Sequence, residues 1–284
     1  MNWQLKILIK LLLSHLPLKY GFWQRIGLFR LGEMDQAEYA EKIFRLHSQR
    51  AYPEGIPADL TFLELGPGDS IASAIIANAC GVGRIYLVDS GDFATRDMTV
   101  YRSMVKQLQD KGLPMRLDMA EIHDFNQLLE ACNATYLTQG LDSLKTIHDR
   151  QIDFVWSHSV LEHIRKRDFP DTFREIRRII KSGGMMSHNV DLMDHLGGGL
   201  NNLRFPEWFW ENDFVANSGF YTNRIRYSEM LAILKDAGFC MEESNHSNWP
   251  ELPISRSSLA TPFHHFSDQE LMVRCCHFLV RPCT

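Results

Sequence analysis

The fold of this chain is decided by the stretch Thr61-Phe62-Leu63-Glu64-Leu65-Gly66-Pro67-Gly68-Asp69-Ser70. An apolar strand enters a Gly-Pro-Gly turn, a helix of small and apolar residues follows, and a second apolar strand ends at Asp89. This order of elements is that of a βαβ unit. Glycines in the first turn let the backbone approach a ligand closely, and an acid about 20 residues downstream can bind ribose hydroxyls. The stretch therefore predicts a site for a nucleoside-bearing cofactor.

The residues of the turn indicate which kind of cofactor binds. A dinucleotide-binding loop has a third small residue where this chain has Ile71, and it seats a pyrophosphate on the helix N-terminus. Glu64 and Asp69 repel a phosphate and favour a cationic ligand with an amino group and a sulfonium. The predicted cofactor-binding residues of this turn and of the end of the second strand are Glu64, Gly66, Pro67, Gly68, Asp69, Asp89 and Ser90.

Three motifs carry a resemblance to a known family. The stretch from Leu63 to Gly68, with Asp89, resembles the first motif and the ribose-binding acid of class I S-adenosylmethionine-dependent methyltransferases. Asp153-Phe154-Val155-Trp156-Ser157, followed by Val160-Leu161-Glu162-His163, resembles the fourth-strand motif of their type 11-like group. Lys181-Ser182-Gly183-Gly184 resembles the turn before the fifth strand, with serine in place of the usual proline. The resemblance implies S-adenosylmethionine as the cofactor and S-adenosylhomocysteine as the product.

The resemblance also implies the architecture. We expect an α/β, Rossmann-like, seven-stranded sheet that is mostly parallel, with an antiparallel edge strand and helices on both faces. An N-terminal helical extension, 1–57, precedes a methyltransferase domain, 58–284, with an acceptor-side insertion at about 192–226. In the family the turn after the third strand lines the adenine, which implies Leu141 and Asp142. Ser157 and His158 end the fourth strand, where ligands of open α/β sheets bind.

Composition limits the partners and the compartment. A net charge of −5 and a pI near 6.2, without a Lys/Arg-rich stripe, argue against a nucleic-acid substrate. The 6 cysteines show no C-x-x-C spacing, so we expect reduced core thiols in a cytoplasmic protein. No apolar run reaches the roughly 18 residues of a membrane span. The composition therefore disfavours a nucleic-acid partner and leaves the oligomeric state open, while the resemblance implies a small-molecule or glycan acceptor.

The first 20 residues allow two interpretations. Apolar positions alternate there with Lys6 and Lys10, and Trp3 and Trp23 flank the segment. Such a helix can lie on a membrane surface, which would place the enzyme near a lipid-linked substrate. It can equally pack on the domain.

Methylation of a hydroxyl needs a base, because the hydroxyl proton is held tightly at neutral pH. The catalytic candidates are His188, Asp191 and His195, which lie on or after the fifth strand, with His158 on the neighbouring strand as the competitor. Three interpretations stay open: a base without metal, which we predict; a divalent metal site that also includes Asp194; and a loop that only shapes the pocket. The metal interpretation follows the magnesium ion of some sugar O-methyltransferases of this fold.

The acceptor is predicted from two further elements. The stretch Ser187–His195 and the stretch Asn223-Arg224-Ile225-Arg226 resemble members of the group found with bacterial surface-glycan genes. We therefore expect O-methylation of a sugar or glycan intermediate. The alternatives are a small aromatic or natural-product acceptor and a non-catalytic scaffold that keeps the fold. Five aromatic residues could stack on a ring of the acceptor or fill a small core of the insertion: Trp208, Phe209, Trp210, Phe220 and Tyr221.

Overall fold

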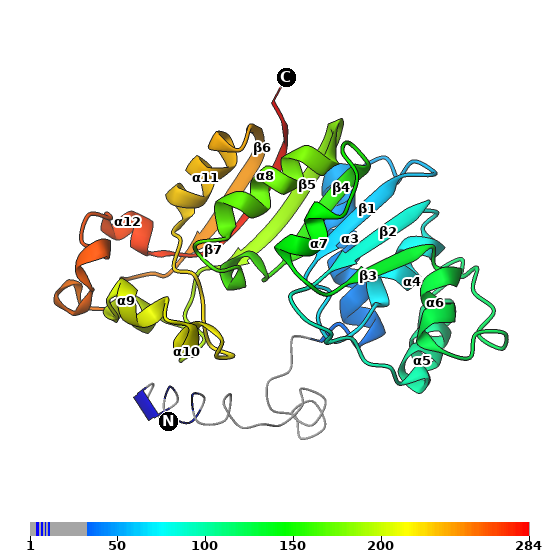
Figure 1. Ribbon diagram of the computed structural model, residues 1–284, viewed down its shortest axis with the longest axis horizontal. Helices are drawn as coiled ribbons and strands as arrows, with labels where there is room; N and C mark the ends of the chain where they lie inside the picture. Colours follow the sequence, from blue (N-terminus) through cyan, green and yellow to red (C-terminus); the bar gives the residue numbers. More distant parts are fainter. Residues whose placement is uncertain (1–3, 6, 8, 10, 12–32, 284) are drawn as a thin grey trace.

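The computed structural model describes residues 4, 5, 7, 9, 11 and 33–283. Its centre is a seven-stranded sheet in the order β3-β2-β1-β4-β5-β7-β6 (Figure 1). β7 is antiparallel to both β5 and β6, and the pairs from β3 to β5 are parallel. The predicted fold class is confirmed, with the antiparallel strand one place in from the edge. The strands are β1 Thr61–Leu65, β2 Arg84–Val88, β3 Ala134–Leu137, β4 Ile152–His158, β5 Ile180–Asp191, β6 Phe239–Asn248 and β7 Val273–Pro282.

Helices cover both faces of this sheet, so its central strands can be apolar on both sides. Figure 1 shows α7, α8 and α11 in front of the sheet and α3 and α4 behind it. Two separate buried clusters result, one on each face, and the sheet lies between them. The main helices are α3 Ala37–Ala51, α4 Ala72–Ala79, α5 Met98–Asp110, α6 Phe125–Ala131, α7 Leu141–Lys145, α8 Phe169–Ile179 and α11 Tyr227–Asp236.

The helix α3 belongs to the same core as the sheet. Its buried residues Ala37, Ala40 and Phe44 recur at helical spacing and join the cluster that also contains α4 and α5. The Phe44 ring lies 6.2 Å from that of Phe62 in β1 and 6.3 Å from that of Trp156 in β4. The predicted division at residue 57 therefore falls between a helix and a strand that share one core.

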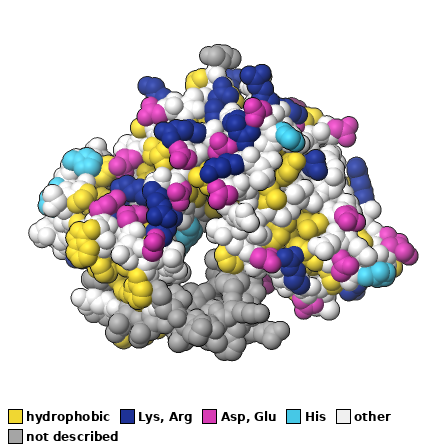
Figure 2. Space-filling model, in the orientation of Figure 1, with side chains coloured by type: hydrophobic (Ala, Val, Ile, Leu, Met, Phe, Trp, Pro, Cys, Tyr) yellow, Lys and Arg dark blue, Asp and Glu magenta, His cyan; other side chains and the backbone are white. Residues whose placement is uncertain are grey.

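The predicted insertion lies between β5 and α11. It contains η2 Asn201–Arg204, α9 Glu207–Trp210 and α10 Asp213–Ala216. Trp210, Phe220 and Tyr221 are buried in a small cluster of its own, so they fill a core. Trp208, by contrast, is 78% exposed, and Figure 2 shows apolar side chains gathered over α9 and α10.

The connection between β6 and β7 is longer than the predicted closing hairpin. The two strands do pair antiparallel, but residues 249–272 intervene, with η3 Arg256–Ser258, η4 Thr261–Phe263 and α12 Asp268–Leu271. Phe263 and Leu271 of this connection form a satellite cluster with Leu200 and Leu203 of the insertion. Two excursions far apart in the sequence thus support one another at the acceptor side of the sheet.

Two of the six cysteines correct the expectation of reduced thiols. Cys240 and Cys283 form a disulfide, with Cα atoms 5.1 Å apart. They are brought together because Cys240, at the start of β6, pairs with Arg281 near the end of β7, and the Cys283 amide donates to Gly238. The disulfide removes one of the observations behind the predicted cytoplasmic location.

The first 20 residues lie mostly outside the described part of the chain. Of those that are described, Ile7 and Leu11 pack against the insertion's aromatic cluster, while Leu5 is 48% exposed. Within the described ranges, 33–283 and the five residues before them, no helix combines the length and apolar character needed to cross a bilayer.

Candidate active site

The glycine turn after β1 adopts the conformation that its sequence requires. Gly66 and Gly68 have φ of 68° and 69°, in the left-handed region that glycine adopts without steric cost. A Cβ built on Gly66 would lie 2.4 Å from Cγ2 of Val160. The turn can therefore close against the segment that follows β4 only because residue 66 has no side chain.

Glu64 supplies a buried carboxylate at the base of this turn. It is 2% exposed, and its Oε2 makes no hydrogen bond of good geometry among the described residues, although the Ser73 side chain lies near enough to lower the pKa of the carboxyl somewhat. Burial raises the pKa of Glu64 to about 8. A buried acceptor without a donor is costly unless a ligand satisfies it, and an ammonium group can do so.

Asp89 ends β2 beside the turn. One carboxylate oxygen accepts from the Gly68 amide at 3.1 Å and the other from the Ser90 amide at 2.7 Å. Burial raises the pKa of Asp89 to about 6, against the effect of these two hydrogen bonds. Each carboxylate oxygen keeps a second lone pair, so the group can still accept from the two hydroxyls of a ribose.

The turn after β3 reaches the same place. The Gly140 amide donates to the Asp89 carbonyl at 2.8 Å, and a Cβ on Gly140 would lie 3.8 Å from the Ser90 Cα. Leu141 follows as a half-buried residue, and Asp142 is exposed and pairs with Lys145 at 2.8 Å. The structure thus brings Leu141 close to the end of β2, while Asp142 faces outward.

The residues of this crevice fit S-adenosylmethionine. The partnerless Glu64 oxygen suits its amino group, Asp89 suits its ribose, and the two buried acids suit a ligand that carries positive charge and no phosphate. Asp69 is also buried, and its carbonyl accepts from the Thr95 amide, which holds the loop after β2 against the turn. When bound, the cofactor supplies an electrophilic methyl group on sulfur.

The residues predicted at the end of β4 do not converge with those after β5. Ser157 Oγ and His188 Nδ1 are 2.7 Å apart, both residues are fully buried, and the His188 ring lies beside Phe173 of α8. His158 points to the opposite face, where its Nδ1 lies 3.2 Å from Nε2 of His47 in α3. The reason is strand alternation, which sends adjacent residues to opposite faces of the sheet. His188 therefore stands apart from Asp191 and His195.

Asp194, which the metal interpretation of the sequence included, anchors a loop. Its Oδ1 accepts from the amides of Leu196, Gly197 and Gly198, and its Oδ2 accepts from Asn201. These five hydrogen bonds occupy the carboxylate. They also fix the loop that carries His195.

A different cluster forms after β4, in the short helix η1 Leu161–His163. Ligand-type atoms of Glu162, His163 and His195 all lie within 4.8 Å of one another. Glu162 is 1% exposed, and burial raises its pKa well above the usual range. The His163 and His195 rings lie 4.8 Å apart, and His163 is exposed. One buried carboxylate and two imidazoles thus meet at the acceptor side.

The stretch Asn223-Arg224-Ile225-Arg226 holds this cluster in place. The Asn223 side chain donates to the carbonyls of Leu161 and Ile164, and its amide donates to the Glu162 carbonyl. Arg226 donates to carbonyls at the end of β5 and before and within β7, including those of Leu192 and Val273. The sequence indicated this stretch only through its resemblance to related proteins. Its structural role is not visible in the sequence, because the carbonyls that accept its hydrogen bonds belong to residues far away in the chain.

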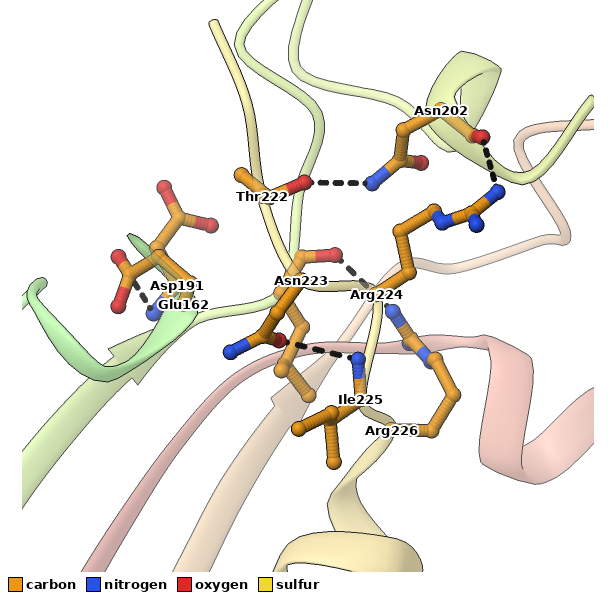
Figure 3. Close-up of a pocket in the computed structure, with 9 residues that line it drawn as sticks. Glu162, Asp191, Asn202, Thr222, Asn223, Arg224, Ile225 and Arg226 are labelled. Atoms are coloured by element: carbon orange, nitrogen blue, oxygen red, sulfur yellow. Dashed lines mark hydrogen bonds between the residues drawn. The ribbon is translucent and has the colours of Figure 1, made fainter. Parts of the chain in front are cut away.

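A small cavity lies beside the cluster, with room of about 10 Å³, roughly that of one water molecule. Figure 3 shows Glu162 and Asp191 together on one side of it, with Asn202 and Arg224 on the other. The Asp191 amide donates to Glu162 Oε1 at 3.3 Å, whereas Glu162 Oε2 has no partner among the described residues. The cavity therefore presents an unsatisfied, buried carboxylate oxygen.

An open, mostly parallel sheet with two buried acids at the ends of its first two strands is typical of the Rossmann-like class of enzymes. Within that class, residues 63–187 match the family described as a methyltransferase domain. This part of the chain runs from β1 into β5 and contains both the crevice and η1. This stretch thus resembles a methyltransferase domain over part of the chain, and the protein is a transferase. Among curated proteins, none matches the sequence.

Several solved structures are similar to this chain at low sequence identity. A chain of the Haloferax volcanii complex between the Trm112 methyltransferase activator and a methyltransferase has 15% identity and a TM-score of 0.46, with 87% of this chain and 93% of that chain covered. A Methanosarcina mazei S-adenosylmethionine-dependent methyltransferase has 13% identity and a TM-score of 0.48, with 82% and 97% covered. Haemonchus contortus phosphoethanolamine N-methyltransferase 2, solved with S-adenosyl-L-methionine, has 14% identity and a TM-score of 0.47, with 86% and 53% covered. Similarities of this size carry no argument about the acceptor.

Proposed function

We propose that the protein transfers a methyl group from S-adenosylmethionine to a hydroxyl of a sugar or glycan intermediate. The observation that carries the cofactor is the pair of buried acids at the carboxyl ends of the neighbouring strands β1 and β2: Glu64, whose Oε2 has no hydrogen-bond partner among the described residues, and Asp89, which directly follows β2. Asp69, Ser90, Leu141 and the glycine turn complete the proposed cofactor site.

The reaction is an in-line displacement at the methyl carbon. The bond from carbon to sulfur breaks with its electron pair remaining on sulfur, and the acceptor oxygen forms the new bond. The protein has to hold donor and acceptor atoms about 3 Å apart and to exclude water. Val160 touches the glycine turn, and Glu162 follows two residues later, so the two parts of the site are joined by a very short segment.

The acceptor hydroxyl must lose its proton, and the cluster at η1 has groups for that step. His163 Nδ1 lies 2.9 Å from the Tyr221 carbonyl, so it carries the ring proton and leaves Nε2 as the basic nitrogen. His195, a predicted base, lies against this ring. Without a bound metal we assign proton removal to this pair, and His188 and His158 are not part of the mechanism because of where they point.

The cavity beside the cluster has room for about one water molecule, so an acceptor would bind outside it, and its Asn202, Thr222 and Asn223 side chains are engaged with one another or with η1. The exposed aromatic ring of Trp208 on the insertion offers a stacking surface for a sugar.

A screen of glycan and nucleotide-sugar acceptors with a labelled methyl donor tests the proposal. We expect label on a sugar hydroxyl, identified by mass spectrometry after hydrolysis. Transfer of the labelled methyl group only to small phenols would contradict a sugar acceptor and support an aromatic one. Calorimetry with S-adenosylhomocysteine tests the scaffold alternative, because a protein that binds no cofactor product is not a methyltransferase.

A further inference from the structure

The cluster at η1 has the composition of a transition-metal site. Two imidazoles and one carboxylate, with ligand-type atoms within 4.8 Å of one another, come from two segments: η1 and the loop after β5. The combination of two histidines with one acid and open positions is found in metal sites for zinc and for non-haem iron.

The surroundings prepare these three side chains as ligands. His163 Nδ1 donates to the Tyr221 carbonyl at 2.9 Å, which orients the ring and leaves Nε2 as the nitrogen that can bind a metal. The loop of His195 is fixed by the five hydrogen bonds to Asp194. Asn223 holds both ends of η1. Contacts of this kind, which orient the ligating side chains, are typical of metal sites in proteins.

Glu162 gives an independent indication of a ligand. Its side chain is almost completely buried, lines the cavity, and has one oxygen without a hydrogen-bond partner in the described part of the chain. Asp191 lines the same cavity and adds negative charge. When ionised, its side chain has no proton to donate to Glu162. A buried carboxylate beside a second acid is stabilised by a cation.

We infer that Glu162, His163 and His195 bind one divalent transition-metal ion at the acceptor side of the site. Imidazole ligands favour Zn²⁺, Ni²⁺ or Fe²⁺ over Mg²⁺, which prefers oxygen ligands and water. This set differs from that of the metal interpretation considered from the sequence, since it replaces His188, Asp191 and Asp194 with Glu162 and His163.

The inference rests on the proposed function for its chemical role. A bound cation can accept an oxygen of the acceptor at an open position and lower the pKa of that hydroxyl. The hydroxyl proton passes to Asp191 and then to solvent, the oxygen attacks the methyl carbon, and sulfur keeps the electron pair of the broken bond. The two imidazoles then act as ligands, and an acceptor with neighbouring hydroxyls gains a second contact with the ion.

The metal alone tests the site, without turnover. The chelator-treated protein, titrated with Co²⁺, should bind one equivalent and develop visible absorption bands of nitrogen and oxygen coordination, and Zn²⁺ should displace it. His195→Ala, on a half-exposed loop residue, and Glu162→Gln should each weaken binding at least tenfold. His123→Ala, which changes an exposed histidine away from the cluster, serves as the matched control and should bind normally.

The outcomes separate this inference from the proposed function. Absence of one-to-one binding, or equal affinity in wild type and His195→Ala, overturns the metal site whatever the activity. Binding that requires the three residues, without methyl transfer to any acceptor, supports the site and counts against the function. A melting curve of each variant by circular dichroism shows whether it is folded, and His195→Ala keeps the test valid if Glu162→Gln unfolds.

Discussion

The cofactor crevice and the η1 cluster are built in different ways. In the crevice, Glu64, Gly66 and Gly68 come from one turn, and Asp89 ends the next strand of the same βαβ unit. At η1, the positions of Glu162 and His163 depend on Asn223 and Tyr221 from the far side of the insertion, and His195 depends on Asp194. A local motif thus defines the first region, whereas long-range contacts define the second. Substitutions should therefore separate cofactor binding from turnover.

The largest expected effect is on the crevice. Asp89→Ala removes the acceptor for the ribose and for the Gly68 and Ser90 amides. Because hydrogen bonds to a buried charge contribute about 1.5–3 kcal/mol each, S-adenosylhomocysteine should bind at least a hundredfold more weakly by calorimetry. Asp110→Ala, an exposed acid at the end of α5, is the control. A change below fivefold for Asp89→Ala would mean that the ribose lies elsewhere.

The second effect is on the η1 cluster. Asn223→Ala leaves the carbonyls of Leu161 and Ile164 without their donor, and they lie 2.8 and 2.9 Å from its Nδ2. Turnover should fall about tenfold or more, because misplacement of reacting groups is costly, while cofactor affinity stays within twofold. Asn126→Ala in α6 should change neither quantity. Equal losses of turnover and of cofactor affinity would show that the two regions are not independent.

The third effect combines binding and stability at Glu64. The pKa of Glu64 is about 8 in the folded protein and about 4.5 in the unfolded chain, so between these pH values the folded protein keeps a proton that the unfolded chain has released. The free energy of unfolding therefore falls as the pH rises from about 4.5 to about 8. Glu64→Gln should raise the free energy of unfolding by up to about 3 kcal/mol at pH 7. It should also weaken cofactor binding about tenfold. Denaturant unfolding at pH 5 and pH 7 checks this, and an equal effect at both values contradicts it.

The same group gives cofactor binding a pH dependence. A cationic ligand favours the ionised carboxylate, so binding should release a proton and tighten as the pH rises from 6 to 8. Calorimetry in buffers of different ionisation enthalpy measures the released proton. Glu64→Gln should lose most of this dependence.

The last effect concerns stability alone, at the histidines away from both regions. Burial lowers the pKa of His188 to about 3 and that of His47 well below its usual value. The unfolded chain binds more protons below pH 6.5, so stability should fall as the pH drops, by on the order of 2 kcal/mol at pH 5 for His188 alone. His188→Gln should flatten this acid slope without a change in the pH profile of turnover. A shifted turnover profile would return His188 to the mechanism.

The sequence by itself determined the sheet and the cofactor crevice. Strand and helix patterns are local, and the left-handed glycines and the acid of one βαβ unit lie within a short stretch, so residues 61–89 contained what the crevice needs. The apolar strands also predicted a mostly parallel sheet with helices on both faces. The family match over residues 63–187 rests on this part of the chain.

Only the tertiary structure decided the acceptor side. The alternation of side chains along a strand predicts that His188 and Asp191 point to opposite faces of the sheet. It does not predict that His188 pairs with Ser157 or that Asp194 anchors a loop. The disulfide between Cys240 and Cys283 depends on the register of β6 and β7 in the same way. These arrangements join residues that are far apart in the sequence, and their partners are fixed by packing of the whole chain and not by any local pattern.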